Sequence, residues 1–150
     1  MIQSILVFDP GESTGWCFQD ITGATCGGTA RKNHLEVAQL IRVTRPDLVV
    51  LERFNLYPQM AKSLSWNSFY PCETIGVIKV VCMELNIPIV EQAPSIKKYF
   101  GGFQEDWQSI GLLPVELEPF SRGVTEHTKD AYMHYRYFVR NGLRKFQGAP

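Results

Sequence analysis

Two carboxylates directly follow apolar segments of this sequence. Asp9 ends the segment 5–8 (ILVF), and Glu52 ends the segment 48–51 (LVVL). Short runs of β-branched and aliphatic residues are typical of strands buried on both faces. If the two strands are parallel neighbours, both acids converge beyond the carboxyl edge of the sheet, where open α/β sheets bind ligands. Paired carboxylates repel each other unless a cation lies between them, and Mg²⁺ suits such oxygen ligands best.

A single acid at a strand end has a plainer interpretation, because it often caps a helix or faces water, and for either acid alone this is the commoner case. A third segment, residues 125–134 (TEHTKDAYMH), shifts the balance. In a helix, His127, Asp130 and His134 project on one stripe past the small Ala131. Burying an acid and a histidine against a sheet costs free energy unless a metal or a charged partner is present. The alternative leaves them in solvent and turns these residues inward: Ala131, Met133, Tyr135 and Phe138.

The elements that position these residues begin with strands. Pro10-Gly11 ends the first strand, and two short antiparallel strands are predicted over 15–19 and 24–29. Asn33 caps a predicted helix that ends before Pro46. The apolar positions expected to face the core in this helix are Leu35, Ala38, Ile41 and Val43. Residues 47–52 form the second buried strand.

The second half of the chain continues this alternation with one long interruption. The pattern predicts a loop over 53–66, a helix over 72–85, a strand over 87–91 and a helix over 93–100 begun by Pro94. Residues 101–123 are rich in glycine, proline and acid, which predicts an ordered surface excursion or lid. The last helix is predicted from Thr125 to Arg140, ended by Asn141-Gly142. With no internal repeat, residues 1–150 are predicted to form one mixed α/β domain.

Length and composition fit an ordinary folded domain. The chain has 150 residues and is 45% hydrophobic, enough to form a core. Its apolar runs are far shorter than the roughly 20 residues of a membrane span, and Met1 leads directly into a strand pattern, so we expect a soluble cytoplasmic protein with no membrane partner. The cysteines show no metal-ligand spacing and are expected to be buried or half-buried thiols. They are Cys17, Cys26, Cys72 and Cys82.

The charges are balanced in number but segregated along the chain. Fifteen Lys and Arg stand against fifteen Asp and Glu, which taken alone argues against a nucleic-acid partner. Between Tyr99 and Ser121, however, there is no basic residue, whereas six basic residues follow from Arg122 onward against only Glu126 and Asp130. A local basic surface near the C-terminal end is therefore compatible with the sequence.

Three motifs together resemble one protein family. The segments 8–16 (FDPGESTGW), 49–52 (VVLE) and 127–131 (HTKDA) have the order and separations of RuvC-type Holliday junction resolvases, especially their phage and prophage relatives. The resemblance covers nearly the whole chain. It implies an RNase H-like α/β fold with a central mixed five-stranded sheet flanked by helices. It also implies a homodimer that resolves four-way DNA junctions as an endonuclease with Mg²⁺ or Mn²⁺.

By position, the resemblance makes Asp9 and Glu52 the strand-borne metal ligands and Asp130 the helix-borne ligand. His127 stands where the family has an acid or a histidine. Hydrolysis of a phosphodiester needs an activated water and a neutralised leaving oxygen, which two cations about 3.5 to 4 Å apart supply. We expect Asp9 to bridge the ions, Glu52 and Asp130 to complete their coordination, and His127 to ligate or orient the water.

Further residues are predicted to contact DNA. The family places an aromatic three residues after the second acid to intrude on junction bases, whereas here Phe54 lies two residues after Glu52 and Asn55 three. Lys97 and Lys98 are placed to meet backbone phosphates, although an ordinary solvated helix face explains them equally well. The same two explanations apply to the basic residues of the last helix: Arg136, Arg140, Arg144 and Lys145. The predicted DNA-contacting set is Ser13, Thr14, Phe54, Asn55, Lys97 and Lys98.

Two other functions fit parts of the pattern. A phosphotransferase of the sugar-kinase and actin-like type also has a first strand ending in Asp-x-Gly, but that class closes two such domains over ATP, and this length provides one. An RNase H-like module that binds DNA or a protein without cutting it keeps the fold but not the acids. All the acids are present here, so the sequence favours a metal-dependent nuclease.

Overall fold

The computed structural model describes residues 1–55, 69–96, 120 and 124–146. Several predictions fall outside these residues: most of the loop over 53–66, the second half of the helix over 93–100, and nearly all of the excursion over 101–123. No helix among the described residues is long and apolar enough to cross a membrane.

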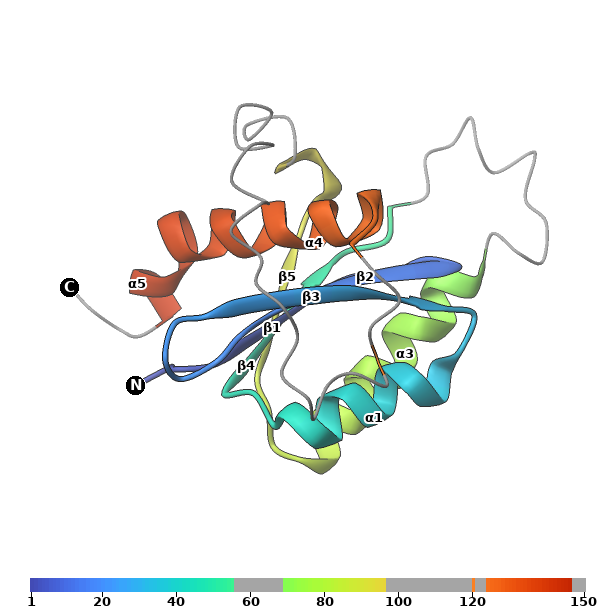
Figure 1. The fold of residues 1–150 in the computed structure, drawn as a ribbon, viewed down its shortest axis with the longest axis horizontal. Helices are drawn as coiled ribbons and strands as arrows, with labels where there is room; N and C mark the ends of the chain where they lie inside the picture. Colours follow the sequence, from blue (N-terminus) through green and yellow to red (C-terminus); the bar gives the residue numbers. More distant parts are fainter. Residues whose placement is uncertain (56–68, 97–119, 121–123, 147–150) are drawn as a thin grey trace.

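A mixed five-stranded sheet forms the centre of the molecule (Figure 1). β1 (Ile5–Asp9), β2 (Ser13–Gln19) and β3 (Thr25–Arg31) form an antiparallel meander, while β4 (Leu48–Glu52) and β5 (Ile89–Gln92) run parallel to β1. The strand order is β3-β2-β1-β4-β5. The predicted sheet is thereby confirmed, and β1 and β4 are adjacent parallel strands.

Helices cover both faces of this sheet. α1 (His34–Thr44) and α3 (Tyr70–Glu84) lie on one face, and α4 (Glu126–Tyr137) lies across the other (Figure 1). After β5, the helix predicted over 93–100 appears in the described residues as a 3₁₀ turn at 94–96. The molecule therefore has three layers, with the strands between two separate apolar cores.

The inner strand β1 is buried on both faces. Leu6 and Phe8 join the core beneath α1 and α3, while Ile5 and Val7 join the core beneath α4. Each of the four is at most 2% exposed. Burying one such side chain stabilises the fold by roughly 1.5 to 3 kcal/mol. A slip of one residue would exchange the two faces, so the two cores together fix the register of β1.

α1 begins where it is predicted but buries a different stripe. Asn33 caps it, because Oδ1 of its side chain accepts the Glu36 N–H at 3.1 Å. Leu35 and Val43 are 62% and 48% exposed, so their predicted place in the core is wrong. The stripe that faces the sheet holds four apolar residues at neighbouring positions, a wider apolar surface than the predicted row. It consists of Val37, Ala38, Leu40 and Ile41.

The last helix continues past its predicted end. α4 leads through a π-helical turn, Phe138–Gly142, into α5 (Leu143–Phe146). Gly142 does not adopt the positive φ of a helix-ending glycine, which among the described glycines belongs to Gly23. A Cβ at position 142 would lie 2.6 Å from the buried Phe138 ring. The prediction that the helix ends here is wrong. Gly142 allows the Phe138 ring to pack closely against its backbone, and it does not form a C-terminal cap.

Three of the four free cysteines are buried, as expected. Burial raises the pKa of the Cys26 and Cys82 thiols to about 12 and also raises the pKa of Cys17. These thiols therefore stay protonated at neutral pH and act as small apolar side chains. Cys72 is exposed instead, because it lies in the first turn of α3 on the side away from the sheet.

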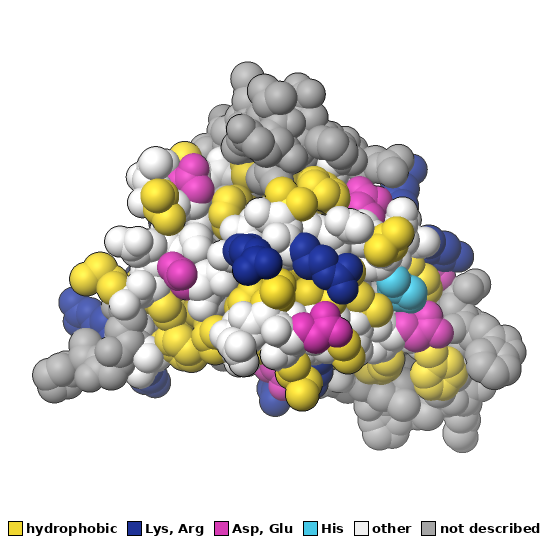
Figure 2. Space-filling model, turned by 90° about the horizontal axis from the view of Figure 1, so that it is seen from below, with side chains coloured by type: hydrophobic (Ala, Val, Ile, Leu, Met, Phe, Trp, Pro, Cys, Tyr) yellow, Lys and Arg dark blue, Asp and Glu magenta, His cyan; other side chains and the backbone are white. Residues whose placement is uncertain are grey.

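The outer face of α1 and α3 is chemically mixed. Figure 2 shows apolar, basic and acidic side chains interspersed over this side of the molecule. Two of its cations are paired with acids: Arg42 with Glu84 at 3.7 Å, and Lys79 with Glu91 at 2.9 Å. Exposed pairs of this kind contribute little to stability, but they prevent an extended field of one sign on this face.

Asp47 ties the N-terminal segment to the start of β4. Its Oδ2 accepts the backbone N–H of Gln3 at 2.8 Å and that of Ser4 at 3.1 Å. The Asp47 N–H donates in turn to the Ser4 carbonyl at 3.1 Å. These hydrogen bonds, the one from Gln3 foremost, hold the pKa of Asp47 below its ordinary value.

We expect Asp47→Asn to lower the free energy of unfolding at neutral pH, because it removes the charge of a carboxylate that accepts two backbone hydrogen bonds. The loss is expected to be only about 1 kcal/mol, since solvent screens this exposed carboxylate. The folded pKa is lower than the unfolded one, so this stabilisation is present above about pH 4 and is lost as the pH falls through the folded pKa. Urea unfolding of both proteins at neutral and at acidic pH measures the difference. A difference of equal size at both would contradict the assignment.

Candidate active site

Asp9 and Glu52 lie at the carboxyl ends of two adjacent parallel strands. Each directly follows the last registered pair of β1 and β4. Because side chains alternate along a strand, Asp9 shares the sheet face of Val7, and Glu52 shares that of Val50. Both valines belong to the core beneath α4. The structure therefore brings the two carboxylates to the same edge and the same face of the sheet.

Both acids are largely withdrawn from water. Asp9 is 7% exposed, and the side chain of Glu52 is 14% exposed. Withdrawal from water disfavours the charged form of a carboxylate unless hydrogen bonds or a nearby cation compensate. For Glu52, one compensating contact is His134, whose Nε2 lies 2.6 Å from Oε2 of the carboxylate.

The start of α4 is pressed against the sheet at Gly15, the register partner of Asp9. A Cβ at Gly15 would lie 1.9 Å from the carbonyl oxygen of His127 and 2.7 Å from the Thr128 nitrogen. Only glycine permits this approach of backbone to backbone. The first turn of α4 is thereby held one strand away from Asp9.

Three threonines fix the same end of the helix. Thr125 is the N-cap, and its hydroxyl accepts the His127 N–H at 3.2 Å. The hydroxyl of Thr128 donates to the Gly28 carbonyl of β3 at 2.9 Å, and the hydroxyl of Thr29 bridges Thr125 at 2.7 Å and Thr128 at 3.1 Å. Because these groups are polar and partly buried, the cluster specifies one position for the start of α4.

The predicted stripe on α4 is divided between core and solvent. Ala131 and His134 are fully buried, as predicted, whereas Asp130 is half-buried and His127 is exposed. The prediction of a core-facing His127 is wrong, because its backbone occupies the contact with Gly15 and the side chain lies outside it. Part of the alternative arrangement also holds, since Tyr135 and Phe138 are buried.

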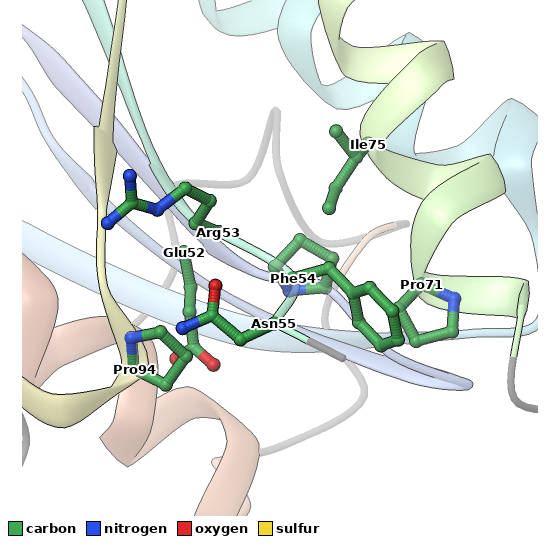
Figure 3. A pocket seen from close by; sticks show the side chains of 8 residues that line it. Glu52, Arg53, Phe54, Asn55, Pro71, Ile75 and Pro94 are labelled. Atoms are coloured by element: carbon green, nitrogen blue, oxygen red, sulfur yellow. The ribbon is translucent and has the colours of Figure 1, made fainter. Parts of the chain in front are cut away.

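A small pocket of about 110 Å³ opens beside Glu52 (Figure 3). It lies between the segment that follows β4, the first turns of α3 and the turn after β5. In Figure 3, the side chain of Phe54 extends toward Pro71, and Asn55 lies between Glu52 and Phe54. The segment for which the resemblance implies contacts with junction bases therefore borders the predicted acid site.

The other predicted DNA contacts differ in their surroundings. Thr14 is 2% exposed, and its hydroxyl donates to the Gly11 carbonyl at 3.1 Å, so it braces the turn that follows Asp9. Ser13 is half-buried at the start of β2. Lys97 and Lys98 lie outside the described residues. The contacts of all four residues with DNA stay predictions.

The carboxylates of Asp9, Glu52 and Asp130 form a donor set that suits a hard divalent cation. Two come from adjacent strands, and the third comes from the helix that covers them. Within the ranges that the structure describes, however, no three or more His, Cys, Asp or Glu side chains are grouped so that they hold one ion. Asp9 and Glu52 thus share an edge and a face of the sheet, while Asp130 belongs to the covering helix.

Sequence reasoning assigned no role in this site to two residues that contact it. His134 hydrogen-bonds Glu52, and its other ring nitrogen, Nδ1, lies 2.8 Å from Oε1 of Gln92. A signal for Gln92 was present, since it is a polar residue directly after the strand predicted over 87–91. In the structure it pairs in register with Glu52. His134 had been placed on the predicted core-facing stripe, one turn after Asp130, but without a partner. Its partner depends on the sheet order, which the sequence does not specify.

Comparisons with known proteins show the fold. No protein-family model matches the sequence, and no curated protein matches it. The structure of Thermus thermophilus RuvC in complex with a Holliday junction substrate matches with a TM-score of 0.62 and 15% identity, over 93% of this chain and 96% of that chain. A structure of T. thermophilus RuvC matches with a TM-score of 0.54 and 16% identity, over the same shares. The chain therefore has the RuvC-like, RNase H-like fold that its motifs predict.

We expect Gly15→Ala to lower the free energy of unfolding by at least about 2 kcal/mol, because its Cβ would overlap the backbone of α4. A matched control is Gly76→Ala in α3, where a Cβ meets no atom within 4 Å. Since alanine favours a helix, that variant is expected to be up to about 1 kcal/mol more stable than the wild type. Urea unfolding measures both, and equal effects of the two substitutions would contradict the close approach at Gly15.

Proposed function

We propose that this protein is a metal-dependent endonuclease that cleaves branched DNA, with four-way junctions as its substrate. The observation that carries the proposal is that Asp9 and Glu52 share one edge and one face of the sheet, beneath the helix that bears Asp130 and His127. The fold supports it, because the similar RuvC structure was solved in complex with a Holliday junction substrate.

Asp9, Glu52 and Asp130 are the residues that would hold Mg²⁺ or Mn²⁺ in this site. When bound, two such ions activate a water and neutralise the charge that develops on the leaving oxygen. The low exposure of Asp9 and Glu52 limits competition from bulk water for their oxygens. His127, exposed at the start of α4, would ligate an ion or orient the attacking water.

DNA contacts are proposed on both sides of the acids. Phe54 and Asn55 border the pocket beside Glu52 and are proposed to meet bases at the branch point. Ser13 and Thr14 begin β2, directly after the turn that follows Asp9, and are proposed to contact the DNA backbone there. The phosphate contacts are assigned to Lys97 and Lys98.

Cleavage of a synthetic four-way junction tests the proposal. The junction is compared with a linear duplex of the same sequence, in Mg²⁺, in Mn²⁺ and in a chelator. We expect paired nicks near the branch point that need both the junction and the metal. Cleavage of the duplex at the same rate, or cleavage in the chelator, would contradict the proposal.

A second candidate is an RNase H-like module that binds branched DNA without cutting it. One observation favours it: in the described part of the chain, the site carboxylates do not group around a single ion position. The same assay separates the two functions. Junction binding in a gel-shift experiment, with no product in either metal, would support the second candidate.

We expect Asp9→Asn to abolish cleavage and to leave junction binding intact or improved, because it removes a metal ligand and lessens repulsion of phosphate. More than about a tenth of wild-type turnover would be incompatible with a role of Asp9 as a metal ligand. Asp47→Asn is the matched control, since it removes a carboxylate at the opposite end of the sheet. Its cleavage rate is expected to equal that of the wild type.

His127 is tested by two substitutions. We expect His127→Ala to lose most of the cleavage activity and His127→Asp to retain much of it, because a carboxylate can replace an imidazole as a ligand. Neither variant should change stability by more than about 0.5 kcal/mol, since the side chain is exposed. If His127→Ala cleaves at the wild-type rate, His127 has no catalytic role, and the catalytic residues are Asp9, Glu52 and Asp130 alone.

The active form is proposed to be a two-fold homodimer. One chain supplies one set of carboxylates, whereas resolving a junction takes two symmetric nicks, and two-fold symmetry is the commonest way to supply a second copy. Light scattering after gel filtration, alone and with junction DNA, measures the mass. A monomer that still makes both nicks in one binding event would rule the dimer out.

A further inference from the structure

His134 is a fully buried histidine whose two ring nitrogens both have partners. Its Nε2 lies 2.6 Å from Oε2 of Glu52, and its Nδ1 lies 2.8 Å from Oε1 of Gln92. Its side chain is 0% exposed, while that of Glu52 is 14% exposed. Since an ionised carboxylate only accepts hydrogen bonds, the Nε2–H of His134 donates to Glu52.

The three residues of this contact come from three different elements. Glu52 and Gln92 end β4 and β5 and are paired in register, and His134 lies on the buried side of α4. Gln92 is itself 7% exposed. The imidazole therefore has one orientation available, between two strand ends, and it fixes one oxygen of the Glu52 carboxylate.

We infer that His134 is a positioning residue for Glu52: by holding Oε2, it fixes the orientation of the carboxylate that would bind a divalent cation. The inference rests on the proposed function, because it assigns Glu52 to a metal site. A glutamate side chain loses rotamer freedom when it binds an ion, and a buried donor that fixes it beforehand reduces that loss. Partners that orient metal ligands in this way commonly change metal affinity by about 10- to 100-fold when they are removed.

The role differs from plain packing in what it does to metal binding. A histidine that only fills space or satisfies Gln92 affects stability and leaves the affinity for a cation unchanged. A histidine that orients Glu52 affects that affinity directly. The positioning role of His134 can therefore be taken over by any side chain that donates an N–H to the same oxygen of Glu52.

The test is Mn²⁺ binding to the full chain without DNA, measured by calorimetry and by the electron paramagnetic resonance of free Mn²⁺. We expect His134→Leu to weaken binding by about 10- to 100-fold. His134→Gln, whose amide can donate to Glu52, is expected to recover most of the loss. Tyr135→Phe is the matched control. It also removes a hydrogen bond made by a buried side chain of α4, but that bond goes to Gln19 of β2 and not to Glu52. It is expected to bind Mn²⁺ like the wild type.

Two outcomes separate this inference from the proposed function. If Glu52→Gln abolishes Mn²⁺ binding while His134→Leu binds like the wild type, the positioning role is overturned and the proposed function stands. If the wild-type protein binds no Mn²⁺, the proposed function fails, and the inference fails with it. A loss in Tyr135→Phe as large as that in His134→Leu would also overturn the positioning role.

A second measurement covers the case in which His134→Leu does not fold. In wild-type protein labelled with ¹⁵N-histidine, the Nε2–H of His134 is expected to give a slowly exchanging signal, because it is buried and hydrogen-bonded. Adding Mg²⁺ is expected to shift this signal, since the ion draws electron density from the shared carboxylate. An unchanged signal under conditions where Mg²⁺ binds would overturn the inference.

Discussion

The parallel pairing of β1 with β4 is the constraint on which the rest of the site depends. Both strands are apolar up to their last residue, so each is buried between two helical layers, and the pairing cannot slip without exchanging the two cores. The first polar side chain of each strand therefore appears at the same edge. Since these are Asp9 and Glu52, packing energy from both cores holds two acids close to each other.

The covering helix is positioned by a different kind of contact. α4 meets the sheet through backbone at Gly15 and through a group of threonine hydroxyls, not through large apolar side chains at its start. Farther along, Ala131 and His134 face the strands. Polar contacts of this kind are directional, so they specify the position of the helix end more narrowly than apolar packing would.

The sequence allowed some of this to be predicted, for identifiable reasons. The ends of β1 and β4 were predictable because an apolar run followed by an acid is a local signal. The exposure of Leu35 was not, because two stripes of α1 have similar apolar content and tertiary packing decides between them. The Glu52–His134–Gln92 contacts join residues far apart in sequence. Such contacts follow only from the order of the strands and the direction of the covering helix.

The π-helical turn at Phe138–Gly142 changes which sides of the helix are occupied by the residues that follow it. A π turn contains one more residue than an α turn, and each residue of an α-helix advances the chain by about 100° around the axis. Everything after the turn is therefore out of angular phase with α4. A helical wheel drawn straight through to Phe146 therefore assigns Arg144 and Lys145 to the wrong sides of the helix.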